Sequence, residues 1–463
     1  MAKKLWGSRF TKGTCALTDK FTSSISFDKR LAKYDIIGSI AHAKMLAKQK
    51  IIAKKDSGMI VKGLNSILKK IDSGGFKFDM QSEDVHSNIQ DVLYKKIGKP
   101  ALKLHTARSR NDQIALDIRM YLMDEVRALF RLTVSLQKSI LKFGKKNSKV
   151  IIPGYTHLQI AQCVLLAHHL LAYIESLERD KARLIDAEKR INQMPLGSGA
   201  LSGTGLPIDR EFVRRELDFQ GVTDNSIDSV SDRDFIIEIL ADLSILSIHL
   251  SRIAEDLILW STKEFNFIEI DFSYCTGSSI MPHKKNPDVL ELIRGYVGRI
   301  HGDLSSVMIL MKGLPFSYNR DLQLDKPPLF NSIDTVKDIL AILARIFNNI
   351  KINSKELALK LMDESLFSVD IVEYLIRKGL SHREAHDIVG RMVKDCLDKG
   401  RKISGLSGRE LKKYSPKLET DVRRILNAWA SVSLKTSHGG TSPKLVARQI
   451  NIWSKRLSAS ACH

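Results

Sequence analysis

Apolar side chains recur at alternating steps of three and four residues over five long stretches of the chain. This spacing places one apolar seam along a helix, so each stretch predicts a long helix. On the order of 25–35 residues per helix corresponds to about 40–50 Å. The seams run from Leu122 to Phe143, Cys163 to Leu184, Ile236 to Leu257, Ile293 to Met311 and Leu329 to Ile350. The pattern predicts an all-α fold built around an elongated bundle.

Outside these stretches the apolar pattern is shorter. Before about residue 107 and after about residue 353 the sequence predicts short helices, one of them over Asp370–Lys378. Ser381 and Glu384 have the spacing of a capping box, which predicts a helix start. Strand-like alternation is scarce. Helices with apolar seams on more than one face usually oligomerise, so we expect an oligomer.

Composition narrows the class of protein. The chain has 463 residues, 43% hydrophobic, and its five scattered cysteines have neither disulfide nor zinc-site spacing. The first ten residues have no apolar core of a signal peptide. Charged residues interrupt the most apolar stretch, from Phe235 to Trp260, which argues against a membrane span. We expect a cytoplasmic protein without a membrane partner.

The net charge of +21 raises the question of an anionic partner. A nucleic acid or an anionic substrate is one interpretation, and a lysine-rich composition spread over solvated surfaces is the other. The lysines occur along the whole sequence, and no basic run is interleaved with aromatic residues. The second interpretation is favoured, so the sequence predicts no nucleic-acid partner.

The segment richest in chemistry runs from Thr276 to Asp288. It contains Gly277-Ser278-Ser279, then Lys284-Lys285, and Asn286-Pro287 in the positions of a helix N-cap and first residue. Hydroxyls, lysines and helix-start N–H groups together form an anion site. Neither Gly-Ser-Ser nor Lys-Lys alone would distinguish this segment from an ordinary loop, but the whole string is specific.

This string resembles the Gly-Ser-Ser-x-Met-Pro-x-Lys-x-Asn-Pro hallmark of the fumarase/aspartase superfamily, whose members release fumarate. Four further strings resemble the argininosuccinate lyase family in order and spacing, as does the N-terminal Leu5–Phe10. They are His105–Gln113, Pro153–Gln159, Asn225–Phe235 and Tyr318–Gln323. The resemblance spans nearly the whole chain.

The resemblance implies three mostly helical domains, with a central five-helix bundle, in a homotetramer. We place the domains at 1–107, 108–353 and 354–463, and the bundle carries most catalytic loops. It also implies active sites built from loops of three subunits. The implied reaction is a reversible anti β-elimination that converts argininosuccinate to arginine and fumarate, as in arginine biosynthesis.

The resemblance also assigns catalytic roles. Ser278 is the catalytic serine, usually taken as the base, and His157 is its acid–base partner. Lys284 and Asn286 hold the reacting carboxylate, and Glu291 orients His157. Which of Ser278 and His157 removes the proton stays open at this point.

Further residues lie in the matched strings as substrate contacts. They are Ser24, Asn111, Thr156, Tyr318, Gln323 and Lys326, together with Arg108, Arg110 and Arg233, whose guanidinium groups suit carboxylates. Asp84, His86 and Asn88 belong to a similar string without definite roles.

Several positions depart from the family pattern, and they bear on substrate affinity more than on reaction class. Ser8 and Ala107 replace glycines, which matters if φ is positive there. The others are Gly205, His283 and Leu324.

Three alternatives remain at this stage. They are adenylosuccinate lyase or fumarase activity, a non-catalytic lens delta-crystallin on the same scaffold, and a nucleic-acid-binding helical protein. We expect no metal and no organic cofactor, because cysteine and histidine lack ligand spacing and no glycine-rich phosphate loop follows a strand.

Overall fold

The computed structural model describes residues 13–459, so the N-terminal string Leu5–Phe10, and Ser8 within it, lie outside the described residues. The chain divides into two compact units, each assembled from three stretches. Unit 1 comprises Met1–Ala128, Ala182–Ser244 and Gly298–Asp334. Unit 2 comprises Leu129–Lys181, Ile245–Val297 and Thr335–His463. The division into domains at residues 107 and 353 stays a prediction.

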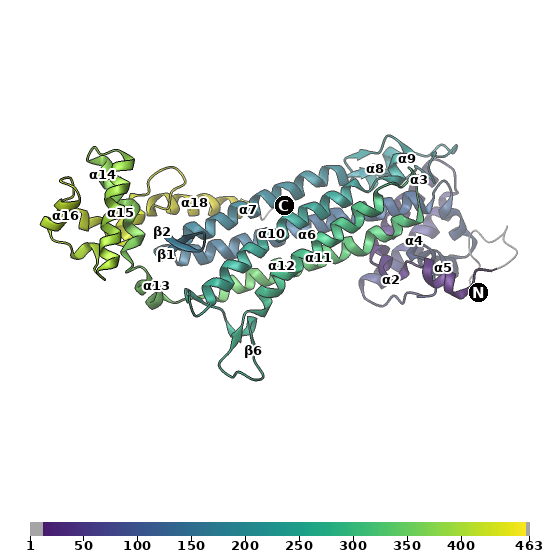
Figure 1. Ribbon diagram of the computed structural model, residues 1–463. Helices are drawn as coiled ribbons and strands as arrows, with labels where there is room; N and C mark the ends of the chain where they lie inside the picture. Colours follow the sequence, from purple (N-terminus) through teal and green to yellow (C-terminus); the bar gives the residue numbers. More distant parts are fainter. Residues whose placement is uncertain (1–12, 460–463) are drawn as a thin grey trace. The chain divides into compact units, whose positions relative to one another are not determined.

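Five long helices confirm the expected all-α architecture (Figure 1). They are α6 (Arg110–Lys146), α7 (Leu166–Ile191), α10 (Asp234–Ser261), α11 (Asp288–Met311) and α12 (Lys326–Asn349). Each contributes one segment to unit 1 and one to unit 2. Their seams are buried in both units. Tyr121 packs edge-on against Phe330 at 5.0 Å in unit 1, and Phe143 packs against Phe347 at 6.1 Å in unit 2.

Two helix starts differ from the prediction. Cys163 lies on strand β2 (Gln159–Leu165), because helix α7 begins only at Leu166. Asn286 is not a helix N-cap, since it lies on strand β7 (Lys285–Asn286) and α11 begins at Asp288. In both places a strand pairing competes with the helix for the same backbone groups.

The rest of unit 1 consists of short helices and one small parallel strand pair. Gly63 on α4 lies where an added Cβ would be 2.5 Å from a Leu93 methyl of α5, so glycine permits close packing of these helices. The helices are α1 (Ala16–Thr22), α2 (Ile25–Asp28), α3 (Ala32–Lys48), α4 (Lys54–Asp72), α5 (Val85–Ile97), α8 (Arg210–Glu216) and α9 (Ser226–Ser231), with 3₁₀ turns at Lys29–Leu31, Lys99–His105 and Arg320–Asp325. Strand β3 (Gln193–Met194) pairs with β4 (Gly221–Val222).

The rest of unit 2 has three antiparallel strand pairs and the C-terminal helices. Strand β1 (Ile151–Thr156) pairs with β2, β5 (Ile268–Glu269) with β8 (Lys351–Ile352), and β6 (Thr276–Gly277) with β7. The helices are α13 (Ser354–Lys360), α14 (Ser368–Arg377), α15 (His382–Asp398), α16 (Gly408–Tyr414), α17 (Ala428–Leu434) and α18 (Pro443–Ala459), with 3₁₀ turns at Phe272–Tyr274, Glu364–Phe367, Ile403–Gly405 and Thr420–Ile425.

The C-terminal helices have a separate apolar cluster within unit 2. It is formed by α14, α15 and the segments that follow, with Leu375, Met392 and Leu411 fully buried. The expected capping box at Ser381 and Glu384 is present at the start of α15. No helix within residues 13–459 is long and apolar enough to cross a membrane.

Candidate active site

The β1–β2 hairpin of unit 2 presents His157 at its tip. Thr156 pairs with Gln159, so His157 and Leu158 form a two-residue turn, and their φ angles are 55° and 57°. Two positive φ values define a turn that usually takes asparagine and glycine. Bulky residues in this conformation are strained, and such strain is concentrated at functional sites. The side chains of Thr156, His157 and Leu158 are all exposed.

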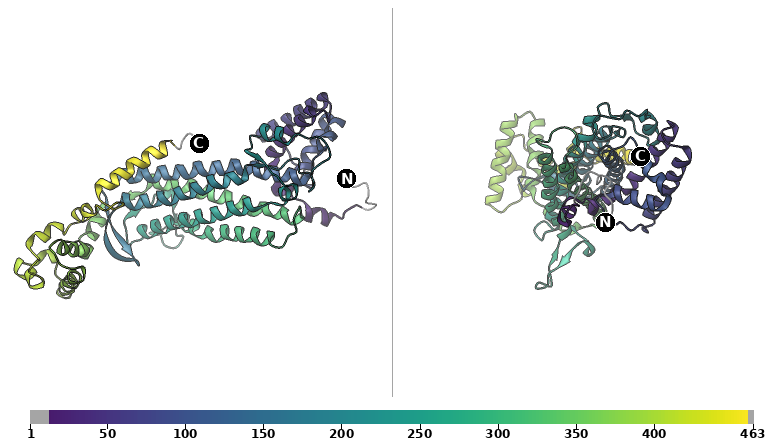
Figure 2. Two further views of the ribbon diagram at one scale, coloured as in Figure 1. Left: turned by 90° about the horizontal axis from the view of Figure 1, so that it is seen from above. Right: turned by 90° about the vertical axis from the view of Figure 1, so that its right-hand side faces the viewer.

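A second hairpin of unit 2, formed by β6 and β7, carries Ser278. Figure 1 shows it extending away from the ends of α10 and α11, and the end-on view of Figure 2 agrees. The Ser278 hydroxyl oxygen accepts hydrogen bonds from the backbone N–H groups of Ile280, at 3.3 Å, and Met281, at 3.0 Å. Two donors on this oxygen stabilise it more as an alkoxide than as a hydroxyl.

The two adjacent lysines of this hairpin have different surroundings. The Lys285 ammonium binds the carbonyl of Ile270, approaches Glu269 at 3.4 Å and lies 3.8 Å from the Phe272 ring centroid. Lys284 is exposed, and no ion pair holds it within the described part of the chain. Lys285 therefore anchors the base of the hairpin, while the charge of Lys284 is available to an anion.

Glu291 lies in the first turn of α11 and is exposed. In residues 13–459, no hydrogen bond or ion pair joins Glu291 to His157 within the chain. Asn286 donates weakly to the Gly277 carbonyl at 3.5 Å, across the base of the hairpin. Unit 2 thus holds the four predicted catalytic residues without contacts among them; His157, Lys284 and Glu291 are exposed, and Ser278 is half-buried.

Unit 1 gathers the predicted substrate contacts around the segment before α5. Ser24 is buried, its backbone N–H donates to the Glu83 carbonyl at 2.9 Å, and its hydroxyl donates to Asp28 at 2.5 Å. Burial raises the pKa of the Asp28 carboxyl, whose second oxygen has no hydrogen-bond partner.

Glu83 connects two arginines of this group. Its carboxylate accepts from Arg110 at 3.2 Å and from Arg320 at 3.0 Å. Arg320 and Gln323 both donate to the Thr22 carbonyl, at 2.5 and 3.3 Å. Segments far apart in the sequence are therefore joined at the residues that the resemblance singled out.

A buried charged group lies beside these residues. Arg233 and Asp325 are fully buried and form an ion pair at 2.6 Å, and Lys326 approaches the other carboxylate oxygen of Asp325 at 2.8 Å. Burial lowers the pKa of Lys326 and raises that of Tyr318. One guanidinium nitrogen of Arg233, Nη2, has no hydrogen-bond partner.

The segment from Ala107 into the first turn of α6 is fixed by contacts with other parts of unit 1. Arg108 donates to the Ser39 hydroxyl at 2.7 Å, and Asn111 donates to the Ala200 carbonyl at 3.1 Å. Asp112 accepts backbone N–H groups of Gly197 and Gly199 at 3.0 and 2.8 Å. Ala107 has φ 57°, so this departure from the family glycine places alanine in the left-handed region.

One group in unit 1 has metal-ligand chemistry. Asp35, His86 and Asp117 are buried, and their ligand atoms lie within 4.8 Å of one another. His86 approaches Asp35 at 3.0 Å and Asp117 at 3.8 Å. Burial opposes the charge of His86, but the attraction and hydrogen bond of Asp35 outweigh it and raise its pKa to about 9. An ion pair between histidine and aspartate accounts for this arrangement.

The two other residues of the His86 string have contacts within their own segment. Asp84 is the N-cap of α5 and accepts the Ser87 N–H at 2.8 Å. The Asn88 side chain hydrogen-bonds both backbone groups of Asp79 at 2.9 Å.

Sequence reasoning missed several residues that organise unit 1. Glu83, Asp112 and Asp325 each join segments that are distant in the sequence, and Arg320 was seen only as part of a string. Each lies within one residue of a predicted site residue or inside a matched string. Proximity to those strings was the sequence signal that could have identified them. Most of their partners are 27 to 237 residues away, so no local pattern predicts the pairing.

Comparison with known proteins shows the family of the chain. The family described as Lyase matches residues 8–302, and the family described as Argininosuccinate lyase C-terminal matches residues 366–433. The argininosuccinate lyase of Geotalea daltonii is 51% identical over 447 residues, which are 96% of this chain and 98% of the relative. That of Acetivibrio thermocellus is 48% identical over 98% of this chain and 99% of the relative.

A solved structure of EDDS lyase in complex with formate resembles the chain with a TM-score of 0.84 and 26% identity, over 94% of this chain and 88% of that one. The 3-carboxy-cis,cis-muconate lactonizing enzyme of Pseudomonas putida has a TM-score of 0.74 at 17% identity, which shows the shared fold. The chain belongs to the argininosuccinate lyase family of the fumarase/aspartase superfamily.

Proposed function

We propose that this chain catalyses the reversible anti β-elimination of argininosuccinate to arginine and fumarate. The observation that carries the proposal is the Ser278 hairpin, where a hydroxyl oxygen with two N–H donors lies six residues before an exposed lysine without an ion pair. The identity of about half over nearly the whole length of argininosuccinate lyases supports the choice of substrate.

The chemical difficulty is the weak acidity of the C–H beside a carboxylate. A base removes this proton, and the carboxylate then gains a second negative charge as the aci-form. We assign the proton transfers to Ser278 and His157. Lys284 and Asn286 stabilise the aci-carboxylate, and Glu291 orients His157 once substrate and the full assembly are present. The N–H donors on Ser278 favour Ser278 as the base, because they stabilise its alkoxide.

We assign substrate binding to unit 1 and to the β1–β2 hairpin. Arg110, Asn111, Tyr318 and Gln323 lie at partly exposed positions, where a ligand reaches them. Arg108 is half-buried, and Arg233 and Lys326 are buried, so these three residues fit a supporting role better than direct contact with the substrate. Ser24 and Thr156 complete the proposed set.

We propose a homotetramer with active sites shared between subunits. Three of the four proposed catalytic residues are exposed, Ser278 is half-buried, and none of the four contacts another within the chain. Helix α11 also exposes large apolar side chains, with Leu292 59%, Met308 53% and Ile309 72% exposed. Exposed apolar residues along one helix are typical of a surface that another subunit covers.

The location that we propose is the cytoplasm, with no metal or organic cofactor in the reaction. The four described cysteines are free thiols, two of them buried. The proposed roles use only side chains and backbone N–H groups of the chain itself.

A substrate panel tests the activity. Fumarate release from argininosuccinate is measured by absorbance and compared with release from adenylosuccinate, malate and EDDS. We expect turnover of argininosuccinate to exceed the others by at least two orders of magnitude. Comparable or faster turnover of any other substrate contradicts the proposal, and no turnover of any substrate supports the non-catalytic crystallin alternative.

A mixing experiment tests the shared sites. Inactive Ser278→Ala and His157→Asn chains are denatured and refolded together, and each is also refolded alone as the control. Activity in the mixture but in neither control is expected, because a mixed assembly contains some sites with both intact residues. Correctly assembled mixed tetramers without activity contradict shared sites.

A further inference from the structure

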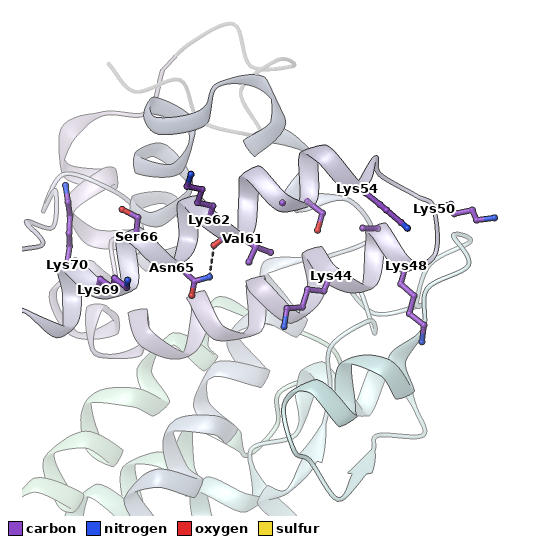
Figure 3. A pocket seen from close by; sticks show the side chains of 13 residues that line it. Lys44, Lys48, Lys50, Lys54, Val61, Lys62, Asn65, Ser66, Lys69 and Lys70 are labelled. Carbon is purple, nitrogen blue, oxygen red and sulfur yellow. Dashed lines mark hydrogen bonds between the residues drawn. The ribbon is translucent and has the colours of Figure 1, made fainter.

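A broad, open groove lies on the surface of unit 1, outside every residue assigned above. Its volume is about 1270 Å³, and it follows α3 and α4. We call it the lysine groove, because seven lysines line it: Lys44, Lys48, Lys50, Lys54, Lys62, Lys69 and Lys70. All seven of these lysines are exposed. Figure 3 shows these lysines distributed along both helices.

The lysine groove concentrates the charge of the chain. Residues 44–70 contain eight lysines and one aspartate, a net charge of +7, which is a third of the total +21 in 27 of 463 residues. The single acid, Asp56, is bound by Lys103 at 2.5 Å. The sequence prediction of no nucleic-acid partner assumed evenly spread lysines, and the structure contradicts that assumption for this surface.

Most of this charge is not neutralised within the chain. Lys44 pairs with Glu216 at 2.7 Å and Lys48 with Asp209 at 3.1 Å. The other five lysines of the groove have no ion pair in the part of the chain that the structure describes. Five neighbouring ammonium groups without counter-charges attract a polyanion and release its counterions on binding.

The shape of the groove suits an extended ligand. Its floor along α4 is a stripe of small or short side chains at helical spacing, namely Ser57, Gly58, Val61, Asn65 and Ser66. A Cβ added at Gly58 would meet nothing within 4 Å, so the floor is open there. Lysines flank the stripe from Lys54 to Lys70, a helical length of about 24 Å at 1.5 Å per residue.

We propose that the lysine groove binds the phosphodiester backbone of a nucleic acid without reading its sequence. The charged length exceeds what a small di- or triphosphate spans, which favours a polymer. No aromatic side chain lines the groove, so bases have no stacking platform, and the contacts are to phosphates. A polyanion complements the uncompensated lysines of this groove, whereas a second copy of this chain has a net charge of the same sign.

The test measures binding of the full-length protein to a fluorescent 24-base-pair duplex of mixed sequence by anisotropy, over a range of salt concentrations. The groove variant carries Lys54→Gln, Lys62→Gln, Lys69→Gln and Lys70→Gln. The matched control variant carries Lys394→Gln, Lys399→Gln, Lys402→Gln and Lys412→Gln, four lysines of unit 2 with the same change of net charge.

The groove variant is expected to bind at least about tenfold more weakly at moderate salt. The magnitude of the slope of log K against log salt falls by roughly 0.9 for each duplex phosphate that the protein no longer neutralises, so four lost lysine contacts lower it by about 3.6. The control variant keeps the slope of the unmodified protein. Fumarate release stays unchanged in both variants, which shows that they are folded and assembled.

Four outcomes overturn the proposal. An equal loss in both variants means that net charge alone causes binding. Absence of duplex binding by the unmodified protein at near-physiological salt excludes a nucleic acid as the partner. Displacement of the duplex by equimolar tripolyphosphate indicates a small-anion site, and binding to vesicles of phosphatidylserine and phosphatidylcholine but not to the duplex indicates a membrane surface.

Discussion

The two units hold their proposed site residues in opposite states. In unit 1, Arg110, Arg233 and Lys326 already have partners, and the last two are buried. In unit 2, His157 and Lys284 are exposed at hairpin tips, with no ion pair within the described residues. Folding of the single chain gives the unit 1 residues their partners. It places the unit 2 residues on hairpins without giving them ion-pair partners among the described residues.

This difference has a physical consequence for mutation. A buried charge that loses its partner is left uncompensated in a medium of low dielectric constant. The substitution therefore lowers the free energy of unfolding. An exposed charge keeps its hydration when the chain is alone, so its loss costs little stability. Its contribution appears when substrate and a neighbouring subunit exclude water. Residues of unit 1 are therefore expected to affect folding, and residues of unit 2 to affect rate.

The largest effect is expected for Arg233→Met in unit 1. It leaves Asp325 with only Lys326 as a buried partner, and breaking such a pair costs roughly 3–5 kcal/mol of unfolding free energy. Urea unfolding of the purified protein measures the loss. The matched control is Arg127→Met, whose pair with Glu188 is 49% and 26% exposed, and which costs about 1 kcal/mol or less. Equal losses for both variants contradict the comparison.

The next effect concerns rate in unit 2. Lys284→Met is expected to lower kcat about 10²–10³-fold, by analogy with loss of one preorganised electrostatic interaction, while substrate Kd rises less. Single-turnover fumarate formation separates the two quantities, and urea unfolding is expected to be unchanged. The adjacent Lys285→Met is the control, since Lys285 anchors the hairpin and a smaller loss of kcat follows. A Kd effect with unchanged single-turnover chemistry would make Lys284 a binding residue only.

A pH dependence separates the units further. His86 in unit 1 has a pKa of about 9 when folded and about 6.5 when unfolded. The histidine therefore binds its proton more tightly in the folded state. Its contribution to stability is complete below pH 6.5 and is lost as pH rises through 9, by up to about 3 kcal/mol.

The measurement compares unfolding free energy between pH 6 and pH 9.5 in the unmodified protein and in His86→Gln. The difference between the two is expected to shrink toward high pH. A constant difference for His86→Gln across this range shows that its charge is not linked to folding.

The smallest effect is expected at the tip of the β1–β2 hairpin. Leu158 has φ 57°, so Leu158→Gly removes strain of the order of 1 kcal/mol and raises stability or leaves it unchanged. We expect activity to fall in the same variant, because a glycine beside His157 loosens the residue that the turn presents. Thermal unfolding measures the stability of this variant, and fumarate release measures its activity. Lower stability in Leu158→Gly shows that the leucine side chain makes a contact that outweighs the strain.

Much of the architecture followed from local pattern. The seams of α10, α11 and α12 could be predicted, because a buried helix repeats its apolar face every three to four residues, whatever it packs against. The capping box at Ser381 could also be predicted, because all its hydrogen bonds lie within four residues. The Ser278 string was recognisable from residue types at fixed spacing.

The helix starts near Cys163 and Asn286 were not predictable in this way. Apolar residues on a strand and on a helix satisfy the same short pattern, and pairing with a distant strand decides between them. Likewise the sequence showed that lysines are abundant, but only the packing of α3 against α4 gathered seven of them along one groove.

The residues of the proposed site also differ in whether the sequence or the tertiary structure identified them. The family resemblance of short local strings assigned roles to Ser278, His157 and Lys284, because each of these residues lies within such a string. The sequence alone did not reveal that Glu83 joins Arg110 to Arg320, or that Asp325 holds Arg233 and Lys326. These partners are up to 237 residues apart, and only the folded chain brings their charges within hydrogen-bond distance. Local sequence thus supplied the proposal of which groups carry the chemistry, and tertiary structure decided which of them are buried, paired and held in place.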